Sequence, residues 1–116
     1  MDDNKKVLKQ LKMGTTEILV LAALSKRDRY GYEITQNVLE HSGGYFELKQ
    51  GFLYPTLGRM EAAELLKGYW KDSKAGGPDR KYYKLTRQGR ARLKSSVAAW
   101  SDFSKKFEKV LDALRA

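Results

Sequence analysis

The hydrophobic positions of this 116-residue chain recur every three or four residues over most of its length, which is the period of an amphipathic helix. They predict four helices, over about residues 5–24, 31–41, 51–65 and 87–116. Gly14 and the two threonines after it are poor helix formers, so the first helix is expected to bend or to divide in two there. Its apolar side comprises Val7, Leu8, Leu11, Ile18, Leu21, Ala22 and Leu24.

Between the third and fourth helices the period changes to that of a strand. Two β-like runs, Leu66–Asp72 and Lys81–Thr86, flank a Gly-Gly-Pro segment that can continue neither a helix nor a ladder, and together they predict a hairpin. Alternation puts Tyr83 and Leu85 on one face, away from Tyr82, and favours them as core residues.

The remaining signals complete the order of elements. A short extended piece is expected over Tyr45–Lys49, and Thr86 is expected to cap the N-terminus of the last helix. The chain is therefore predicted to be α+β and mostly α. Its element order is typical of a winged helix-turn-helix, in which the third helix enters the major groove and the hairpin, the wing, contacts the backbone or the minor groove.

The last helix carries apolar residues at alternating steps of four and three, the heptad seam of a coiled coil. Its positions, interrupted only by the polar Ser104, are Leu93, Val97, Trp100, Ser104, Phe107, Leu111 and Leu114. A helix of roughly 28 residues is about 40 Å long, more than a domain of this size covers, so its exposed end is expected to pair with another chain. The alternative is a helix packed wholly within its own domain.

Charge is concentrated in one region. From Lys67 to Lys94 the chain has ten Lys or Arg and two acids, Asp72 and Asp79, so ten minus two gives +8 of a total of +9. Cations gathered on one hairpin indicate a polyanionic partner. The alternative is a lysine-rich solvated edge that prevents aggregation of the strands.

A DNA-reading helix needs donors and flat side chains near its N-terminus, where backbone N–H groups also favour phosphate. The third helix offers Lys49, Gln50, Tyr54, Thr56 and Arg59. Arg59 is expected to contact phosphate or to pair with Glu61 or Glu64. The wing offers Lys74, Gly76, Gly77, Arg80 and Lys81, although Lys81 could instead solvate an edge strand.

The sequence lacks the residues that other classes of function require. The absence of cysteine excludes a disulfide framework, a thiolate metal site and a cysteine nucleophile, and suits a cytoplasmic protein. His41 is the single histidine, and there is no Walker loop or metal-ligand cluster, so no enzyme activity, metal or cofactor is expected. The start lacks the order of a signal peptide and the apolar run Ile18–Leu24 is too short for a bilayer, so no membrane partner is expected.

Three motifs carry a resemblance to a known family: Tyr30–Ile34 (YGYEI), Gly51–Glu61 (GFLYPTLGRME) and Gly76–Gly89 (GGPDRKYYKLTRQG). In this order and spacing they resemble PadR-family transcriptional regulators of the short class with one C-terminal helix. The resemblance implies a homodimeric winged-helix repressor and a palindromic operator. It also implies a DNA-binding domain over residues 1–86, with the wing at 66–86, and a dimerisation helix over 87–116 that packs on the partner's first helix.

By position, the resemblance adds Tyr32, Gly51 and Pro55 to the candidate DNA contacts. Tyr54 and Thr56 are expected to touch phosphate or base edges, with Leu53 packing in part. Of Tyr30 and Tyr32, which open the second helix, one is expected to pack on the core and the other to offer its hydroxyl to phosphate.

Some short PadR-like regulators bind planar aromatic or cationic drugs between two tryptophans at the dimer centre, and Trp100 occupies the matching position. Two indole faces can sandwich a flat ligand by stacking. The resemblance gives Leu11, Gly14, Ile18, Phe103 and Ser104 as neighbouring wall residues. Ser104 replaces an acid of the drug-sensing relatives, which argues against a cationic drug, and the alternative is that Trp100 only packs the dimer seam.

The sequence thus predicts a DNA-binding repressor released by a small planar aromatic effector. An effector-independent DNA-binding module, or a protein-interaction module that uses the wing, is the alternative.

Overall fold

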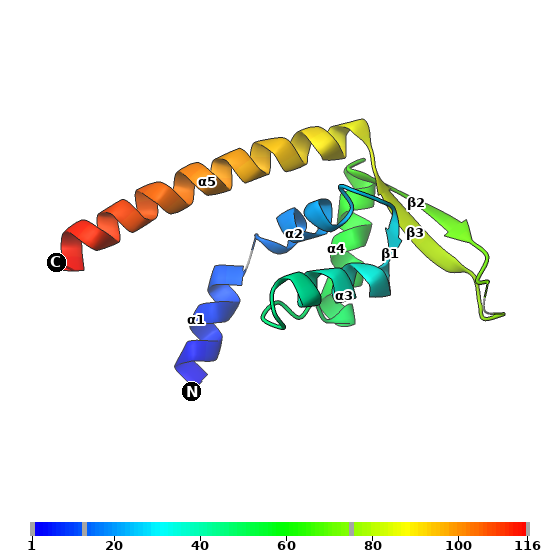
Figure 1. Cartoon of the computed structure of the whole chain (residues 1–116), viewed down its shortest axis with the longest axis horizontal. Helices are drawn as coiled ribbons and strands as arrows, with labels where there is room; N and C mark the ends of the chain where they lie inside the picture. The colour runs from blue at the N-terminus through cyan, green and yellow to red at the C-terminus, as the bar shows by residue number, and fades with distance from the viewer. Residues whose placement is uncertain (1, 13, 75, 116) are drawn as a thin grey trace.

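The computed structural model describes residues 2–12, 14–74 and 76–115, with side chains from Lys5 onward; Met13 and Ala75, which fall in the predicted first helix and hairpin loop, lie outside the described residues. The elements are α1 (Asp2–Lys12), α2 (Thr16–Ala23), β1 (Arg29–Tyr30), α3 (Gly31–His41), α4 (Gln50–Ala62), β2 (Leu66–Lys71), β3 (Arg80–Leu85) and α5 (Arg87–Arg115) (Figure 1). The predicted helices and both hairpin strands are confirmed to within a few residues. Within these ranges no helix is long and apolar enough to cross a membrane.

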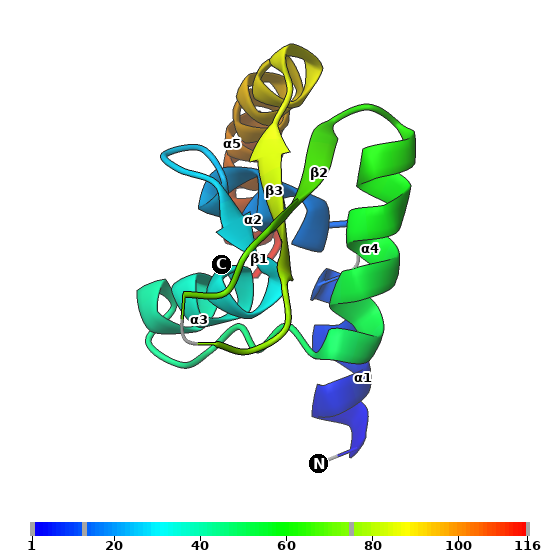
Figure 2. The ribbon, with the colours of Figure 1, turned by 90° about the vertical axis from the view of Figure 1, so that its right-hand side faces the viewer.

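Helices α2, α3 and α4 surround one apolar core, which the sheet closes on one side (Figure 2). Each helix contributes residues spaced by three or four positions, such as Leu53, Leu57 and Met60 of α4. Tyr83 and Leu85 of β3 are buried in the same core, as the alternation along this strand predicted.

The predicted first helix divides in two. Gly14 adopts a left-handed backbone conformation (φ 82°), and the Thr15 hydroxyl donates to the Lys12 carbonyl oxygen at 2.8 Å. The apolar side divides with the helix, because residues of α2 such as Leu21 enter the core whereas Val7 and Leu11 of α1 remain exposed. The apolar residues of α1 therefore add little to the core of this chain.

The three strands form one antiparallel sheet in the order β1-β3-β2. In β1, Arg29 pairs with Tyr83 and Tyr30 with Tyr82. The extended piece expected at Tyr45–Lys49 does not pair as a strand, and the third strand of the sheet is β1 instead. A run of two residues is too short to show alternation, so only its pairing with β3 reveals β1.

Helix α5 is anchored at its N-terminus and projects away from the core (Figure 1). The Thr86 hydroxyl accepts a hydrogen bond from the Gly89 N–H at 3.0 Å, which confirms the predicted N-cap, and donates to the Glu64 carbonyl oxygen at 2.6 Å. Leu93 packs against the core. With 29 residues α5 is about 43 Å long, so most of it extends beyond the core in a molecule of 59 × 35 × 23 Å.

Candidate nucleic-acid interface

One face of α4 is exposed and carries very little side chain. The core-facing positions are Leu53, Thr56, Leu57 and Met60. The exposed positions opposite them are Gly51, Pro55, Gly58 and Ala62. A Cβ on Gly51 or Gly58 would meet no other part of the protein within 4 Å. Another molecule can therefore approach the α4 backbone closely along this bare face.

Polar side chains border the bare face. Lys49, Gln50 and Arg59 are exposed, and the exposed ring of Phe52 lies on the same helix. The first turn of α4 also presents backbone N–H groups that favour an anion. The N-terminal half of α4 thus combines cations, an amide and free backbone donors.

Thr56 is placed differently from the other predicted contacts. Its side chain is only 4% exposed, and its hydroxyl donates to the Phe52 carbonyl oxygen at 2.9 Å and accepts from Arg59 Nη2 at 3.1 Å. Among the ion pairs of the described residues, none joins Arg59 to Glu61 or Glu64. Thr56 therefore orients a guanidinium that has no carboxylate partner within this part of the chain.

Tyr54 connects the two helices of the helix-turn-helix. Its ring lies on Gly31, the first residue of α3, and the side chain is still 46% exposed. Tyr32, one residue further along α3, is also exposed, so two phenol groups reach solvent near the start of α3.

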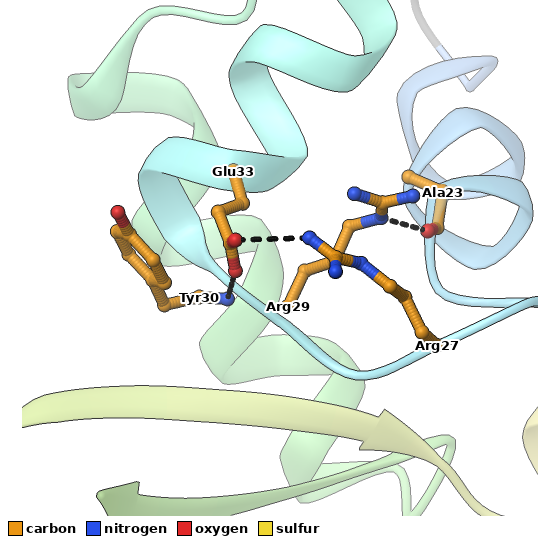
Figure 3. A network of polar contacts seen from close by, with 5 residues as sticks. All are labelled: Ala23, Arg27, Arg29, Tyr30 and Glu33. Carbon is orange, nitrogen blue, oxygen red and sulfur yellow. Dashed lines mark hydrogen bonds and ion pairs between the residues drawn. The ribbon is translucent and has the colours of Figure 1, made fainter. Parts of the chain in front are cut away.

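The start of α3 is held by a network of polar contacts, drawn in Figure 3. Glu33 accepts from the Tyr30 N–H at 3.2 Å and from Arg27 Nη2 at 3.0 Å. Arg29 Nε donates to the Ala23 carbonyl oxygen at 2.7 Å and so ties β1 to the end of α2. The N-terminus of α3 is thereby fixed relative to the core.

Four tyrosines form a row across the outer face of the sheet and the start of α3. They are, in order, Tyr32, Tyr30, Tyr82 and Tyr69, with ring centroids 6.5, 5.3 and 5.9 Å apart. The Arg80 guanidinium carbon lies 4.6 Å from the Tyr30 centroid, and Lys71 Nζ lies 5.0 Å from that of Tyr82. The row therefore places Arg80 next to the start of α3 and Lys71 on the same face of the sheet.

The far end of this tyrosine row is fixed by Asp28. The Tyr69 hydroxyl donates to Asp28 Oδ2 at 2.6 Å. This hydrogen bond, together with burial, raises the pKa of Tyr69 to about 12, because an ionised phenolate could not donate to the carboxylate. The bond joins the wing to the turn between α2 and β1.

The base of the wing is joined to α4 through Glu61. Its Oε1 accepts from Lys81 Nζ at 3.0 Å and its Oε2 from the Gly68 N–H at 3.2 Å. A Cβ on Gly68 would overlap the Lys81 side chain, so glycine makes room for the ion pair. The hydrogen bond to Glu61 raises the pKa of Lys81, and burial raises that of Tyr83. Lys81 is thus already paired within the protein.

The outer face of the wing carries like charges directly opposite one another. Lys67 pairs with Lys84 across the hairpin, and Lys71 with Arg80. All four are exposed, as are Lys74, Gly76 and Gly77 in the loop. Like charges at directly opposed positions destabilise a strand pair, so this surface is suited to a polyanion that neutralises it.

The predicted dimer and effector residues lie apart from this surface. Trp100 (51% exposed), Phe103 (60% exposed) and Phe107 form an aromatic ridge on α5, with ring centroids 6.2 and 5.8 Å apart. Val97 and Leu114 are also exposed, and Ser104 and Leu111 are half-buried. Near the N-terminus, Leu11 of α1 and Gly14 in the turn after it are exposed, and Ile18 of α2 is half-buried. Figure 1 shows α1 and the free part of α5 splayed apart, so within one chain α1, which carries Leu11, lies away from the aromatic ridge.

The sequence of residues 20–95, from α2 through the wing to the start of α5, matches the family model described as the transcriptional regulator PadR-like family. The chain belongs to the PadR-like family of transcriptional regulators. A PadR family transcription regulator of Clostridium difficile is 36% identical over 84% of this chain and 99% of its own, with a TM-score of 0.73. A PadR family transcriptional regulator of Eggerthella lenta is 28% identical over 95% and 93%, with a TM-score of 0.83. Bacillus subtilis PadR, solved in complex with operator DNA, shares the fold (24% identity, TM-score 0.66, 73% of this chain and 48% of that one).

The family assignment confirms the resemblance that the three motifs indicated, and it also confirms the predicted winged-helix fold. Sequence reasoning on this PadR-like chain did not single out Phe52, Lys71 or Lys84 as surface candidates. The strand register could have identified Lys71, because it places this residue beside Arg80. The helical periodicity of α4 could have identified Phe52, because it places this residue outside the core. Both depend on element boundaries that a single sequence leaves uncertain by a residue or two.

Proposed function

We propose that this PadR-like protein is a transcriptional repressor that binds a palindromic operator as a homodimer, with α4 in the major groove and the wing on the adjacent backbone or minor groove. The observation that carries the proposal is the bare face of α4, bordered by exposed cations and flanked by the basic wing. The fold shared with operator-bound Bacillus subtilis PadR supports this docking.

The proposed direct contacts are exposed residues of α3, α4 and the wing: Tyr32, Lys49, Gln50, Gly51, Tyr54, Pro55, Arg59, Lys71, Lys74 and Arg80. Thr56 and Lys81 are positioning residues instead, because one orients Arg59 and the other holds the wing on Glu61.

Salt dependence tests the DNA-binding proposal. Each phosphate neutralised lowers the slope of log affinity against log salt by about 0.9. Replacing Lys71, Lys74 and Arg80 together by Ala should therefore flatten the slope by two to three such steps. The matched control removes the same charge from α5, through Lys105, Lys106 and Lys109, and should leave the slope unaltered. If both triple variants gave the same salt slope, the wing would be excluded from the DNA contact. If the wild-type protein bound no duplex even at low salt, a protein-interaction module would be favoured instead.

Dimerisation is proposed from the long helix. Residues 1–86 would form the reading domain, and residues 87–116 the dimerisation helix, packed on α1 of a second copy. Its seam would consist of Leu93, Val97, Trp100, Phe107, Leu111 and Leu114. Two copies are needed because a palindrome presents half-sites about 34–36 Å apart.

A buried charge should break this seam. Phe107→Glu is expected to shift the sedimentation of the protein to that of a monomer at micromolar concentration, since an unpaired carboxylate is costly in an apolar interface. Lys105→Glu, on the polar side of α5, is the control and should leave the state unchanged. A wild-type monomer would refute the proposal.

The effector is proposed separately. Trp100 and Phe103 offer exposed aromatic faces that would stack on a planar aromatic compound, with Leu11, Gly14, Ile18 and Ser104 as wall residues in the dimer. Trp100→Ala should abolish quenching of tryptophan fluorescence by planar aromatic compounds. Quenching that persists unaltered would come from Trp70, the second tryptophan, and would remove the effector site.

A further inference from the structure

Trp70 is the most exposed aromatic side chain of the described residues, at 67%. It lies on β2, an edge strand of the sheet, opposite Lys81. Its ring is in none of the aromatic or cation–π pairs found among the described residues. This large apolar ring therefore adds nothing to the core and is available to a molecule that covers the edge strand.

The strand register fixes the direction in which Trp70 points. Side chains two residues apart share a face, so Trp70 shares the face of Gly68 and Leu66. This face is turned toward α4, because Gly68 and Lys81 both donate to Glu61 of α4. Trp70 therefore stands on the inner side of the wing, the side next to the recognition helix.

The two faces of the wing differ in chemistry. The outer face has the exposed cations Lys71 and Arg80. On the inner face the cross-strand neighbour of Trp70 is Lys81, whose charge is already paired with Glu61. The inner face thus offers an aromatic surface and one indole N–H donor instead of a free cation.

A second copy of the chain is an unsuitable occupant for this site. The aromatic ridge lies on the part of α5 that projects away from the core, and this part and the wing lie at opposite ends of the long axis of the molecule (Figure 1). A dimer built on that ridge leaves Trp70 uncovered. A molecule that sits against α4, in contrast, passes directly beside the inner face of the wing.

We propose that Trp70 packs its ring against the sugars of the DNA strand that borders the groove entered by α4, with its Nε1–H donating to a phosphate oxygen of that strand. This inference rests on the proposed operator binding and adds a contact that carries no charge. Trp70 would contribute affinity by excluding water from sugar and ring surfaces, whereas Lys71, Lys74 and Arg80 contribute through phosphate charge.

The test compares Trp70→Thr with the wild type on an operator duplex selected from random DNA. Thr keeps the β-propensity of the strand, so thermal unfolding should be almost unchanged. Affinity should fall by about tenfold or more, as for a buried aromatic anchor, while the slope against salt stays the same, because indole is uncharged. Trp70→Phe, which keeps one aromatic ring but loses the N–H donor and the second ring of indole, should fall between the two.

Fluorescence reports the contact directly. In a Trp100→Phe protein, whose own DNA affinity serves as the reference, Trp70 is the single tryptophan. Operator DNA should quench its emission and protect it from acrylamide. A Trp70→Thr protein that binds as tightly as the wild type, or loses affinity only through a flatter salt slope, overturns the inference while operator binding stands. Failure of the wild type to bind any duplex overturns both.

Discussion

The ring of Tyr54 occupies the space that a side chain on Gly31 would need. A Cβ at position 31 would stand 2.7 Å from the Tyr54 hydroxyl oxygen and 2.9 Å from two of its ring carbons. The first residue of α3 and the exposed side of α4 are therefore in direct contact. This contact explains why a Tyr-Gly-Tyr motif and helix α4, far along the chain, belong to one surface.

Gly31→Ala should displace Tyr54. The ring is half exposed and can swing outward, so the free energy of unfolding should fall by only about 1 kcal/mol, at the low end for overpacking. DNA affinity should fall as far as it does in Tyr54→Ala. In a double-mutant cycle measured by DNA binding, Gly31→Ala should have no further effect once Tyr54 is alanine. Additive losses would show that the two residues act separately.

Gly58→Ala should separate folding from DNA binding. The added methyl group meets nothing in the protein and removes a flexible glycine from a helix interior, so the unfolding free energy should rise by about 0.5–1 kcal/mol. The methyl also lies on the bare face of α4, so DNA affinity should drop. Chemical denaturation and duplex titration of one preparation measure both effects. A variant that is more stable and binds DNA normally would remove this face from the interface.

Gly89→Ala should detach α5 from the body. A Cβ there would overlap the Leu65 carbonyl oxygen, which belongs to a backbone that cannot swing aside. We expect a loss of about 1–3 kcal/mol in unfolding free energy. Thr86→Ala removes the N-cap and should cost about 1 kcal/mol. Thermal unfolding followed by circular dichroism measures both; Gly89→Ala with wild-type stability would contradict the close approach of α5 to Leu65.

The Tyr69–Asp28 bond should appear as alkaline sensitivity. Folded Tyr69 holds its proton up to about pH 12, whereas an unfolded tyrosine releases it near pH 10, so the unfolded state binds fewer protons between these values. The stabilisation is complete below pH 10 and is lost as pH rises through about 12. Asp28→Asn lowers the pKa of Tyr69 and should flatten this loss.

Denaturant unfolding at pH 8 and pH 11, with tyrosinate absorbance as a direct titration, measures the difference between Asp28→Asn and the wild type. The raised pKa values of Lys81 and Tyr83 act in the same direction but are present in both proteins, so they cancel. Identical pH profiles would show that the Asp28 carboxylate does not raise the pKa of Tyr69.

Much of this protein could be read along the chain because the signals are local. Helical periodicity placed Leu53, Leu57 and Met60 inward, alternation buried Tyr83 and Leu85, and Thr86 capped α5. Each of these features depends on neighbours within about one turn or on the two faces of a strand. The three motifs likewise identified the family, since their order and spacing can be read directly from the sequence.

Contacts between segments far apart in the sequence could be identified only from the tertiary structure. The two residues of β1 become a strand only because β3 lies beside them, and Lys81 has an ion-pair partner only because Glu61 reaches it from α4. The turn of α4 likewise carries Thr56 inward, behind Arg59. Local pattern states which residues can form an element, but which polar group is already satisfied depends on what long-range packing brings within about 3 Å of it.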